Sequence, residues 1–130
     1  MKILITGGCG FLGSNLAADA FSKGDELYLF DNLSRYGSKE NLSWLQKQGK
    51  CKFEQGDIRN QDAINKAIQS FKPDVVFHAA AYKHVPMQEE HPWEAVFTNI
   101  QGTLNLMDAS EDYGVDRFVL VSTDKAVNPT

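Results

Sequence analysis

The sequence is poor in cysteine, has no long apolar run and carries no excess of positive charge. Its 130 residues include two cysteines, Cys9 and Cys51, which form no Cys-x-x-Cys pair and accompany no paired histidines, so we expect no metal site. No apolar run approaches the ~18 residues that cross a bilayer, and too few apolar residues follow Met1 for a signal peptide. The formal net charge of −4 argues against a nucleic-acid or membrane-surface partner. These absences favour a protein of the reducing cytoplasm.

What the sequence does contain is a regular alternation of strand and helix patterns, without repeats or low-complexity linkers. A chain of this length is expected to form one domain, residues 1–130, with a sizeable core. Apolar runs predict strands, and patterns of helical period separate them; the strands fall at 3–5, 27–30, 52–55, 75–77 and 117–121. Such an order implies parallel strands with right-handed crossovers. We predict an α/β fold with a doubly wound parallel sheet, five strands in order 3-2-1-4-5, and flanking helices.

The first strand runs directly into a glycine-rich turn. Gly7, Gly10 and Gly13 follow it at Gly-x-x-Gly-x-x-Gly spacing, with an amphipathic helix behind them. In a strand-turn-helix that binds a dinucleotide, the first glycine permits the tight turn, the second the close approach of a pyrophosphate, and the third the packing of the helix on the sheet. The anion would lie on free N–H groups at the helix start, around Phe11 and Leu12. The alternative is a strand-turn-helix without a ligand.

An acidic residue closes the second strand pattern. Asp31 lies eighteen residues after Gly13, close to the ~20 expected for the carboxylate that binds the ribose hydroxyls of NAD. Such a carboxylate accepts hydrogen bonds from both hydroxyls and repels a 2′-phosphate. Arg35 could bind a 2′-phosphate, but Asp31 stands nearer the strand end, so the pattern favours NAD over NADP. The alternative is an acidic loop residue with no ligand.

Further candidates follow the third strand. Asp57 can accept a hydrogen bond from an adenine amino group, and Ile58 can cover the adenine ring. Asp57 also fits a simple turn before the next helix, which Asn60 can cap.

The segment after the fourth strand combines small and basic residues. Ala79, Ala80 and Ala81 leave room for a ligand against the backbone, as expected at the crevice of such a sheet. Lys83 could reach a phosphate or ribose. His78, which precedes the alanines, is not expected to be a metal ligand.

The last long helix pattern begins near Pro92, a favoured first-turn residue. Its apolar stripe is expected to face the core; it consists of Val96, Ile100, Leu104 and Met107. Asn99 lies one position from the stripe, where it can point toward a cofactor or bond locally. Ser122 follows the fifth strand, at the edge where functional groups of such sheets collect.

Together these motifs resemble the extended short-chain dehydrogenase/reductase family of sugar-nucleotide epimerases and dehydratases, over all 130 residues. The run TGGCGFLG at 6–13 is similar to its TGxxGxxG signature, and DNLSR at 31–35 and GDIR at 56–59 are similar to its adenosine-side motifs. The resemblance implies a Rossmann fold with NAD as cofactor. It places Asn32, Ser34 and Arg35 with Asp31 in the cofactor site.

The two halves are similar to different members of that family. Residues 1–77 look most like CDP-tyvelose (CDP-paratose) 2-epimerases, through GGCGFLGSNLA and FDNLSR. Residues 78–130 look like UDP-N-acetylglucosamine 4,6-dehydratases of the polysaccharide-biosynthesis group, through HAAAYKHVP and VSTDKAVNPT. Either the chain is a natural intermediate between these groups or it is a chimera of both.

The resemblance also implies catalytic positions, but an incomplete set. In the dehydratase group Thr123 would hydrogen-bond the sugar hydroxyl, Asp124 would act as general acid and Lys125 as general base. The family also uses a Tyr-x-x-x-Lys or Met-x-x-x-Lys pair. None of the four tyrosines and three methionines of this sequence has a lysine four residues later.

Three hypotheses follow. The first is an NAD(H)-binding Rossmann module without turnover of its own. The second is part of an active epimerase or dehydratase that takes a nucleotide-sugar only when another segment or chain completes it. The third is a scaffold that binds no cofactor, in which an exposed edge at the fifth strand could pair two copies into a homodimer.

Overall fold

The computed structural model describes residues 1–82 and 85–122, and its centre is a five-stranded parallel sheet. The order is β3-β2-β1-β4-β5, which confirms the predicted doubly wound topology. The strands are β1 (Lys2–Thr6), β2 (Glu26–Asp31), β3 (Cys51–Gln55), β4 (Val75–His78) and β5 (Arg117–Leu120). Each predicted strand is present, with ends that differ by at most one residue.

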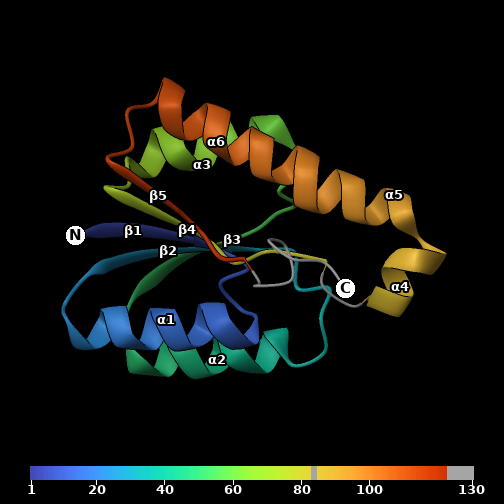
Figure 1. The fold of residues 1–130 in the computed structure, drawn as a ribbon. Coiled ribbons are helices and arrows are strands. Elements are labelled where there is room, and N and C mark those ends of the chain that lie inside the picture. Colours follow the sequence, from blue (N-terminus) through green and yellow to red (C-terminus); the bar gives the residue numbers. More distant parts are fainter. Residues whose placement is uncertain (83–84, 123–130) are drawn as a thin grey trace.

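Helices cover both faces of this sheet, as Figure 1 shows: α1 and α2 lie on one side, and α3 and α6 on the other. Their bounds are α1 (Phe11–Ser22), α2 (Ser38–Gln48), α3 (Gln61–Phe71), α4 (Val85–Glu90), α5 (Pro92–Ala95), the π-helical segment η1 (Val96–Gln101) and α6 (Gly102–Asp112). The short helices α4 and α5 stand beyond the carboxyl ends of the strands (Figure 1). The connection that leaves β1 and the connection that leaves β4 lie on opposite faces of the sheet. The gap between these two strands is therefore the switch point where ligands bind in such sheets.

Alternate residues of the strands build two separate cores. In β1, Ile3 and Ile5 belong to the core under α1 and α2, whereas Leu4 belongs to the core under α3 and α6. This alternation follows from the two-residue period of a strand. Because helices cover both faces of the sheet, β1 is apolar almost throughout. This is why a short apolar run was enough to predict the strand.

The helix ends follow their local sequence signals. The Asn60 side chain accepts a hydrogen bond from the backbone N–H of Ala63 and so caps α3. Gly24, at φ +78°, follows the end of α1, and Gly49 follows the end of α2. The predicted cap by Asn60 is therefore confirmed, and glycine is a common residue after the end of a helix.

The predicted core face of the last helix is wrong. Val96, Ile100, Leu104 and Met107 are 38–57% exposed. The buried side of α6 is instead formed by Gly102, Asn105, Leu106, Ala109 and Ser110.

Close approach of α6 to the connection before α3 explains this choice of face. A Cβ at Gly102 would lie 2.6 Å from the Cδ1 atom of Ile58, so a larger residue there would require the Ile58 side chain to shift. The buried polar side chains are satisfied, because Asn105 donates to the carbonyl of Ile58 at 2.9 Å and Ser110 donates to the carbonyl of Leu106 at 2.6 Å. The four apolar residues of the predicted stripe therefore lie on the outward face.

Candidate functional site

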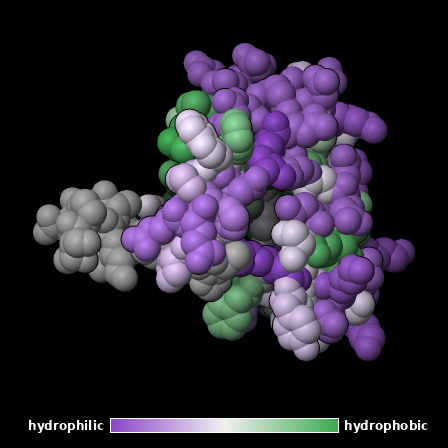
Figure 2. All heavy atoms as spheres, turned by 90° about the vertical axis from the view of Figure 1, so that its right-hand side faces the viewer, coloured by the Kyte–Doolittle hydropathy of each residue, from purple (hydrophilic) through white to green (hydrophobic). Residues whose placement is uncertain are grey.

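The carboxyl ends of β1, β2 and β4 meet around the glycine turn. The N–H of Gly7 donates to the carbonyl of Phe30 in β2 at 2.9 Å, and the N–H of Ala79 donates to the carbonyl of Thr6 at 3.0 Å. The turn is therefore held to a neighbouring strand on either side. Figure 2 looks onto this end of the molecule, where hydrophilic side chains surround a recessed centre.

The three glycines of the turn meet different surroundings. Gly7 has φ +67°, and a Cβ on it would lie 2.7 Å from the carbonyl oxygen of Ala79. A Cβ on Gly13 would lie 2.2 Å from the carbonyl oxygen of Gly7. Gly13 thus lets the first turn of α1 lie close against the glycine turn, while the rest of the helix packs on the sheet. At Gly10 an added Cβ would meet, among the described residues, only the Gly7 oxygen at 3.2 Å, so its other side is open to a ligand.

The start of α1 faces this open space. Gly10 is the N-cap and no side chain of the described residues caps it. The N–H groups of Phe11, Leu12 and Gly13 therefore have no acceptor within the helix. The side chains of Phe11 and Leu12 are exposed. Unpaired N–H groups at the positive end of a helix dipole can bind an anion.

Asp31 is buried beside the same turn. One carboxylate oxygen accepts from the N–H of Cys9 at 2.9 Å, and the other accepts from the N–H of Leu33 at 2.8 Å. Each oxygen keeps a further lone pair for a ligand hydroxyl. Burial, with a smaller contribution from the Asp31 charge, raises the pKa of the Cys9 thiol to about 12. Cys9 is therefore a neutral packing residue of the turn.

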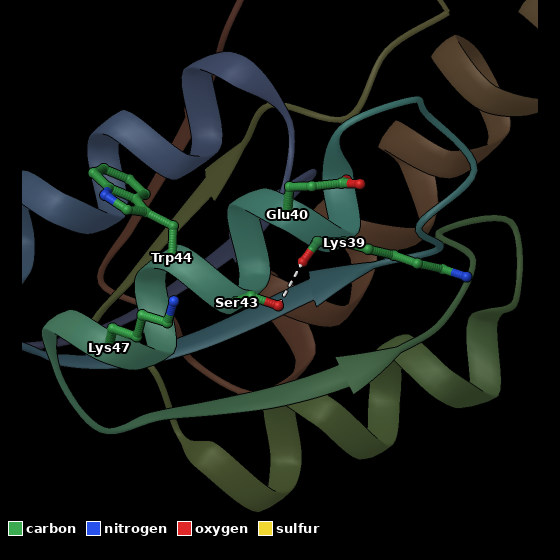
Figure 3. Close-up of a pocket in the computed structure, with 5 residues that line it drawn as sticks. All are labelled: Lys39, Glu40, Ser43, Trp44 and Lys47. Atoms are coloured by element: carbon green, nitrogen blue, oxygen red, sulfur yellow. Dashed lines mark hydrogen bonds between the residues drawn. The ribbon is translucent and has the colours of Figure 1, made fainter.

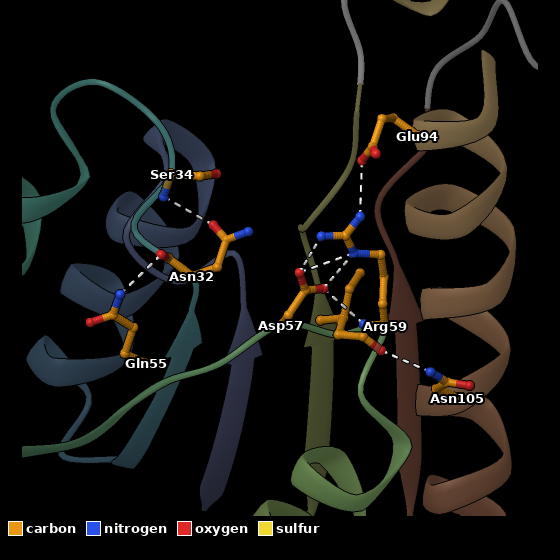
Figure 4. A network of polar contacts seen from close by, with 8 residues as sticks. Asn32, Ser34, Gln55, Asp57, Arg59, Glu94 and Asn105 are labelled. Atoms are coloured by element: carbon orange, nitrogen blue, oxygen red, sulfur yellow. Dashed lines mark hydrogen bonds and ion pairs between the residues drawn. The ribbon is translucent and has the colours of Figure 1, made fainter. Parts of the chain in front are cut away.

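The residues after Asp31 line the exposed connection to α2. The side-chain oxygen of Asn32 accepts from the N–H of Ser34 at 3.0 Å, and Gln55 donates to the Asn32 carbonyl (Figure 4). The Arg35 guanidinium carbon lies 5.6 Å from the centre of the Tyr82 ring. This cation–π contact joins the connection after β2 to the connection after β4, across the glycine turn.

Asp57 and Ile58 contact other residues of the protein in this structure. Arg59 forms ion pairs with Asp57 at 2.6 Å and with Glu94 of α5 at 2.9 Å (Figure 4). The hydrogen bond from Arg59 lowers the pKa of Asp57. Ile58 is buried in the core under α3 and α6, so its contact with an adenine ring stays a prediction.

The alanine segment after β4 is held by a residue of η1. Ala79 and Ala80 are half-buried and Ala81 is exposed. The Asn99 side chain accepts from the Tyr82 N–H at 2.8 Å and donates to the Tyr82 carbonyl at 2.9 Å. Asn99 therefore bonds the crevice segment itself. Ser122 is exposed. Four predicted site residues lie outside the described residues: Lys83, Thr123, Asp124 and Lys125.

Sequence reasoning gave no function to the residue that ends β4. His78 is buried; its Nδ1 lies 2.8 Å from the Thr6 hydroxyl and its Nε2 lies 3.0 Å from the Thr103 hydroxyl. Burial lowers the pKa of His78 to about 4, so the ring is neutral. The sequence did contain a signal for this residue: a polar side chain at a strand end, directly before three alanines.

A surface hollow lies away from this turn. It is formed on the outer side of α2 by Lys39, Glu40, Ser43, Trp44 and Lys47 (Figure 3). These side chains come from one helix and include no residue of the glycine turn. We assign the hollow no function.

Sequence comparison identifies the family. Residues 3–130 match the family described as polysaccharide biosynthesis protein. The chain belongs to this family. The match is continuous through both halves of the chain.

Members of the polysaccharide biosynthesis family and their relatives match the chain over nearly its full length. CDP-paratose 2-epimerase of Salmonella typhi is 43% identical over 98% of this chain and 38% of that protein. The capsular polysaccharide biosynthesis protein CapD of Staphylococcus aureus is 37% identical over 98% of this chain and 22% of that protein. The chain thus spans less than half the length of these relatives.

A solved structure shares the fold. UDP-glucose 4-epimerase of Thermus thermophilus, in complex with NAD, is 35% identical with a TM-score of 0.85, over 95% of this chain and 38% of that one. No helix among the described residues of the present chain is long and apolar enough to span a membrane. The described residues also contain no cluster of three or more metal-ligating side chains.

Proposed function

We propose that residues 1–130 are the NAD(H)-binding Rossmann module of a sugar-nucleotide epimerase or dehydratase. One observation carries the proposal: the Asp31 carboxylate and the unpaired N–H groups of α1 flank the same glycine turn. A carboxylate for ribose hydroxyls and a helix start for a pyrophosphate are the two elements that a dinucleotide needs side by side. The epimerase that was solved with NAD supports the proposal.

The residues of the turn fit the cofactor. The open side of Gly10 admits backbone contact with a pyrophosphate, because no described atom other than the Gly7 oxygen lies near the position of a Cβ. Phe11, Leu12 and Gly13 would donate their N–H groups to it. Asp31 would accept from the adenosine ribose, with Asn32, Ser34 and Arg35 beside it. When bound, NAD would accept a hydride from the sugar and return it.

The other predicted contacts extend the site along the strand ends. Asp57 and Ile58 would face the adenine on the β3 side. The remaining contacts would lie on the β4 and β5 side: Ala79, Ala80, Ala81, Lys83, Asn99 and Ser122.

Asp31 favours NAD over NADP. Its carboxylate is fixed by two backbone N–H groups, so it cannot easily turn away from a 2′-phosphate. Arg35 is the candidate that the sequence suggests for binding that phosphate. Its guanidinium lies over Tyr82 instead.

We propose that residues 1–130 alone bind the cofactor without turnover. They contain no Tyr-x-x-x-Lys or Met-x-x-x-Lys pair, although Thr123, Asp124 and Lys125 match catalytic positions by resemblance. The second candidate is an active epimerase or dehydratase that needs further residues. It is supported by the 38% share of CDP-paratose 2-epimerase that the chain spans. A nucleotide-sugar would bind only in that larger protein.

Calorimetric titration of the purified chain with NAD and with NADP tests the proposal. We expect NAD to bind with clear preference. Equal affinities would contradict the assignment of Asp31 and direct attention to Arg35. Binding of neither would favour the scaffold hypothesis. Incubation with UDP-N-acetylglucosamine or CDP-paratose, followed by product analysis, tests turnover; detectable product would contradict a module without activity.

A homodimer through β5 is also proposed. In the described part of the chain β5 pairs only with β4, so its other edge offers unpaired backbone groups to a second copy. The apolar side chain of Leu120 in this strand is exposed. A mass measurement in solution by light scattering tests this pairing, and a monomer at high concentration would contradict it.

A further inference from the structure

A chain of buried and partly buried hydrogen bonds runs from Thr6, the last residue of β1, to η1 through the ring of His78. Thr103 donates its hydroxyl proton to the carbonyl of Asn99 at 2.7 Å. Its oxygen must then accept from the Nε2–H of His78, at 3.0 Å. The Nδ1 atom is left as an acceptor, and the Thr6 hydroxyl donates to it at 2.8 Å. The neighbours thus select one neutral tautomer of His78.

The far end of this chain acts on the crevice segment. Asn99 holds both backbone groups of Tyr82 with its side-chain amide. Asn99 lies in η1, where the N–H of Gly102 donates to the carbonyl of Phe97, five residues back. Such wide turns recur at functional sites. The Thr103 hydroxyl bonds the carbonyl of Asn99 and so fixes this turn where the amide can reach Tyr82.

The sheet order decides which half of a dinucleotide would meet Tyr82. Asp31 ends β2 on one side of the glycine turn, and Ala79–Tyr82 follow β4 on the other side. If the adenosine ribose lies on Asp31, the second half of the ligand extends over the end of β4. The alanines at 79–81 would therefore border the nicotinamide half, and Tyr82, whose ring contacts Arg35, would stand at the boundary between the two halves.

We propose that His78 is a positioning residue that, through Thr103 and Asn99, holds Tyr82 and the alanine segment at the distance from the glycine turn that the nicotinamide half of NAD requires. The proposal rests on the NAD-binding function given above. Thr6 and His78 are 0% and 2% exposed, so they act through this chain of bonds and not by contact with the ligand.

Two substitutions at Thr103 test the relay. Thr103→Val keeps the shape of the side chain but removes the hydroxyl, whereas Thr103→Ser keeps the hydroxyl. We expect Thr103→Val to weaken NAD binding by about tenfold, a factor that corresponds to ~1.4 kcal/mol, and to leave ADP binding unchanged. Thr103→Ser should bind both ligands like the unaltered chain. ADP supplies the adenosine and pyrophosphate without the nicotinamide half.

The outcomes separate the relay from a general structural effect. An equal loss of NAD and ADP affinity in Thr103→Val, or no loss of either, would overturn the relay. Failure of the unaltered chain to bind NAD or ADP at all would overturn the proposed function, and the relay with it. Thermal unfolding of both variants verifies that they are folded.

The tautomer of His78 provides a readout that does not depend on any ligand. Long-range ¹H–¹⁵N spectra of the unaltered chain at neutral pH should show a protonated Nε2 and an unprotonated Nδ1. The opposite tautomer would overturn the direction of the hydrogen bonds and thus the relay. In Thr103→Val the Nε2 proton should exchange faster with water.

Discussion

The Asp31 carboxylate accepts a hydrogen bond from the backbone N–H of Cys9 at 2.9 Å, so the end of β2 fixes the glycine turn that follows β1. The residue proposed to bind the ribose is therefore also a structural partner of the proposed pyrophosphate site. Because one side chain serves both, its replacement should affect affinity and the shape of the turn together.

Replacement of Asp31 by asparagine tests this double role. We expect Asp31→Asn to weaken NAD binding by at least about tenfold, because one charge-assisted hydrogen bond is worth ~1.5–3 kcal/mol, and to reduce the preference over NADP. Titration calorimetry measures both. Asp19→Asn is the matched control, because Asp19 is exposed on α1 and the net charge changes equally. Unchanged cofactor preference in Asp31→Asn would contradict the ribose assignment.

Two glycines of the turn should affect different properties: Gly13 the stability of the fold, and Gly10 the binding of NAD. A Cβ at position 13 would lie 2.2 Å from a backbone oxygen, so Gly13→Ala should lower the free energy of unfolding by about 1–3 kcal/mol. Gly10→Ala should cost about 1 kcal/mol or less but weaken NAD binding by about tenfold or more, ~1.4 kcal/mol. Urea unfolding and calorimetry distinguish the two. Tight NAD binding by Gly10→Ala would count against close approach of the pyrophosphate.

Two leucines of α6 provide a test of the face that this helix buries. Leu106 is fully buried and Leu104 is 46% exposed. Leu106→Ala should lower the free energy of unfolding by about 2–5 kcal/mol, whereas Leu104→Ala should change it by about 0.5 kcal/mol or less. Chemical denaturation measures both variants. Equal losses would show that the outer face of α6 is also covered.

The buried neutral His78 should make stability depend on pH. Burial lowers its pKa from 6.5 to about 4, so between these values the unfolded chain binds the proton that the folded chain excludes. The free energy of unfolding should therefore fall as pH drops from about 6.5 to 4, by about 3 kcal/mol from this residue. Urea unfolding across this range measures the change, and NMR titration of the ring assigns it. A His78 ring that titrates near pH 6.5 in the folded protein would contradict the prediction.

The sequence by itself determined the order of the elements, the sheet topology and the position of the glycine turn. These features depend on local properties: apolar runs form strands, Asn60 caps a helix, and glycines permit the turn. Because the strands are parallel and the crossovers are right-handed, few strand orders are possible. Asp31 could be placed at the turn for the same reason, because it directly follows the apolar run of β2.

Only the tertiary structure decided which face of α6 is buried and what the polar residues at the strand ends contact. The apolar residues of that helix predicted the wrong face, because the helix lies close to Ile58 along the side that carries Gly102. The bond between His78 and Thr103 joins residues twenty-five positions apart, and no local pattern encodes it. Such contacts arise when the sheet brings the ends of β1 and β4 together beneath η1.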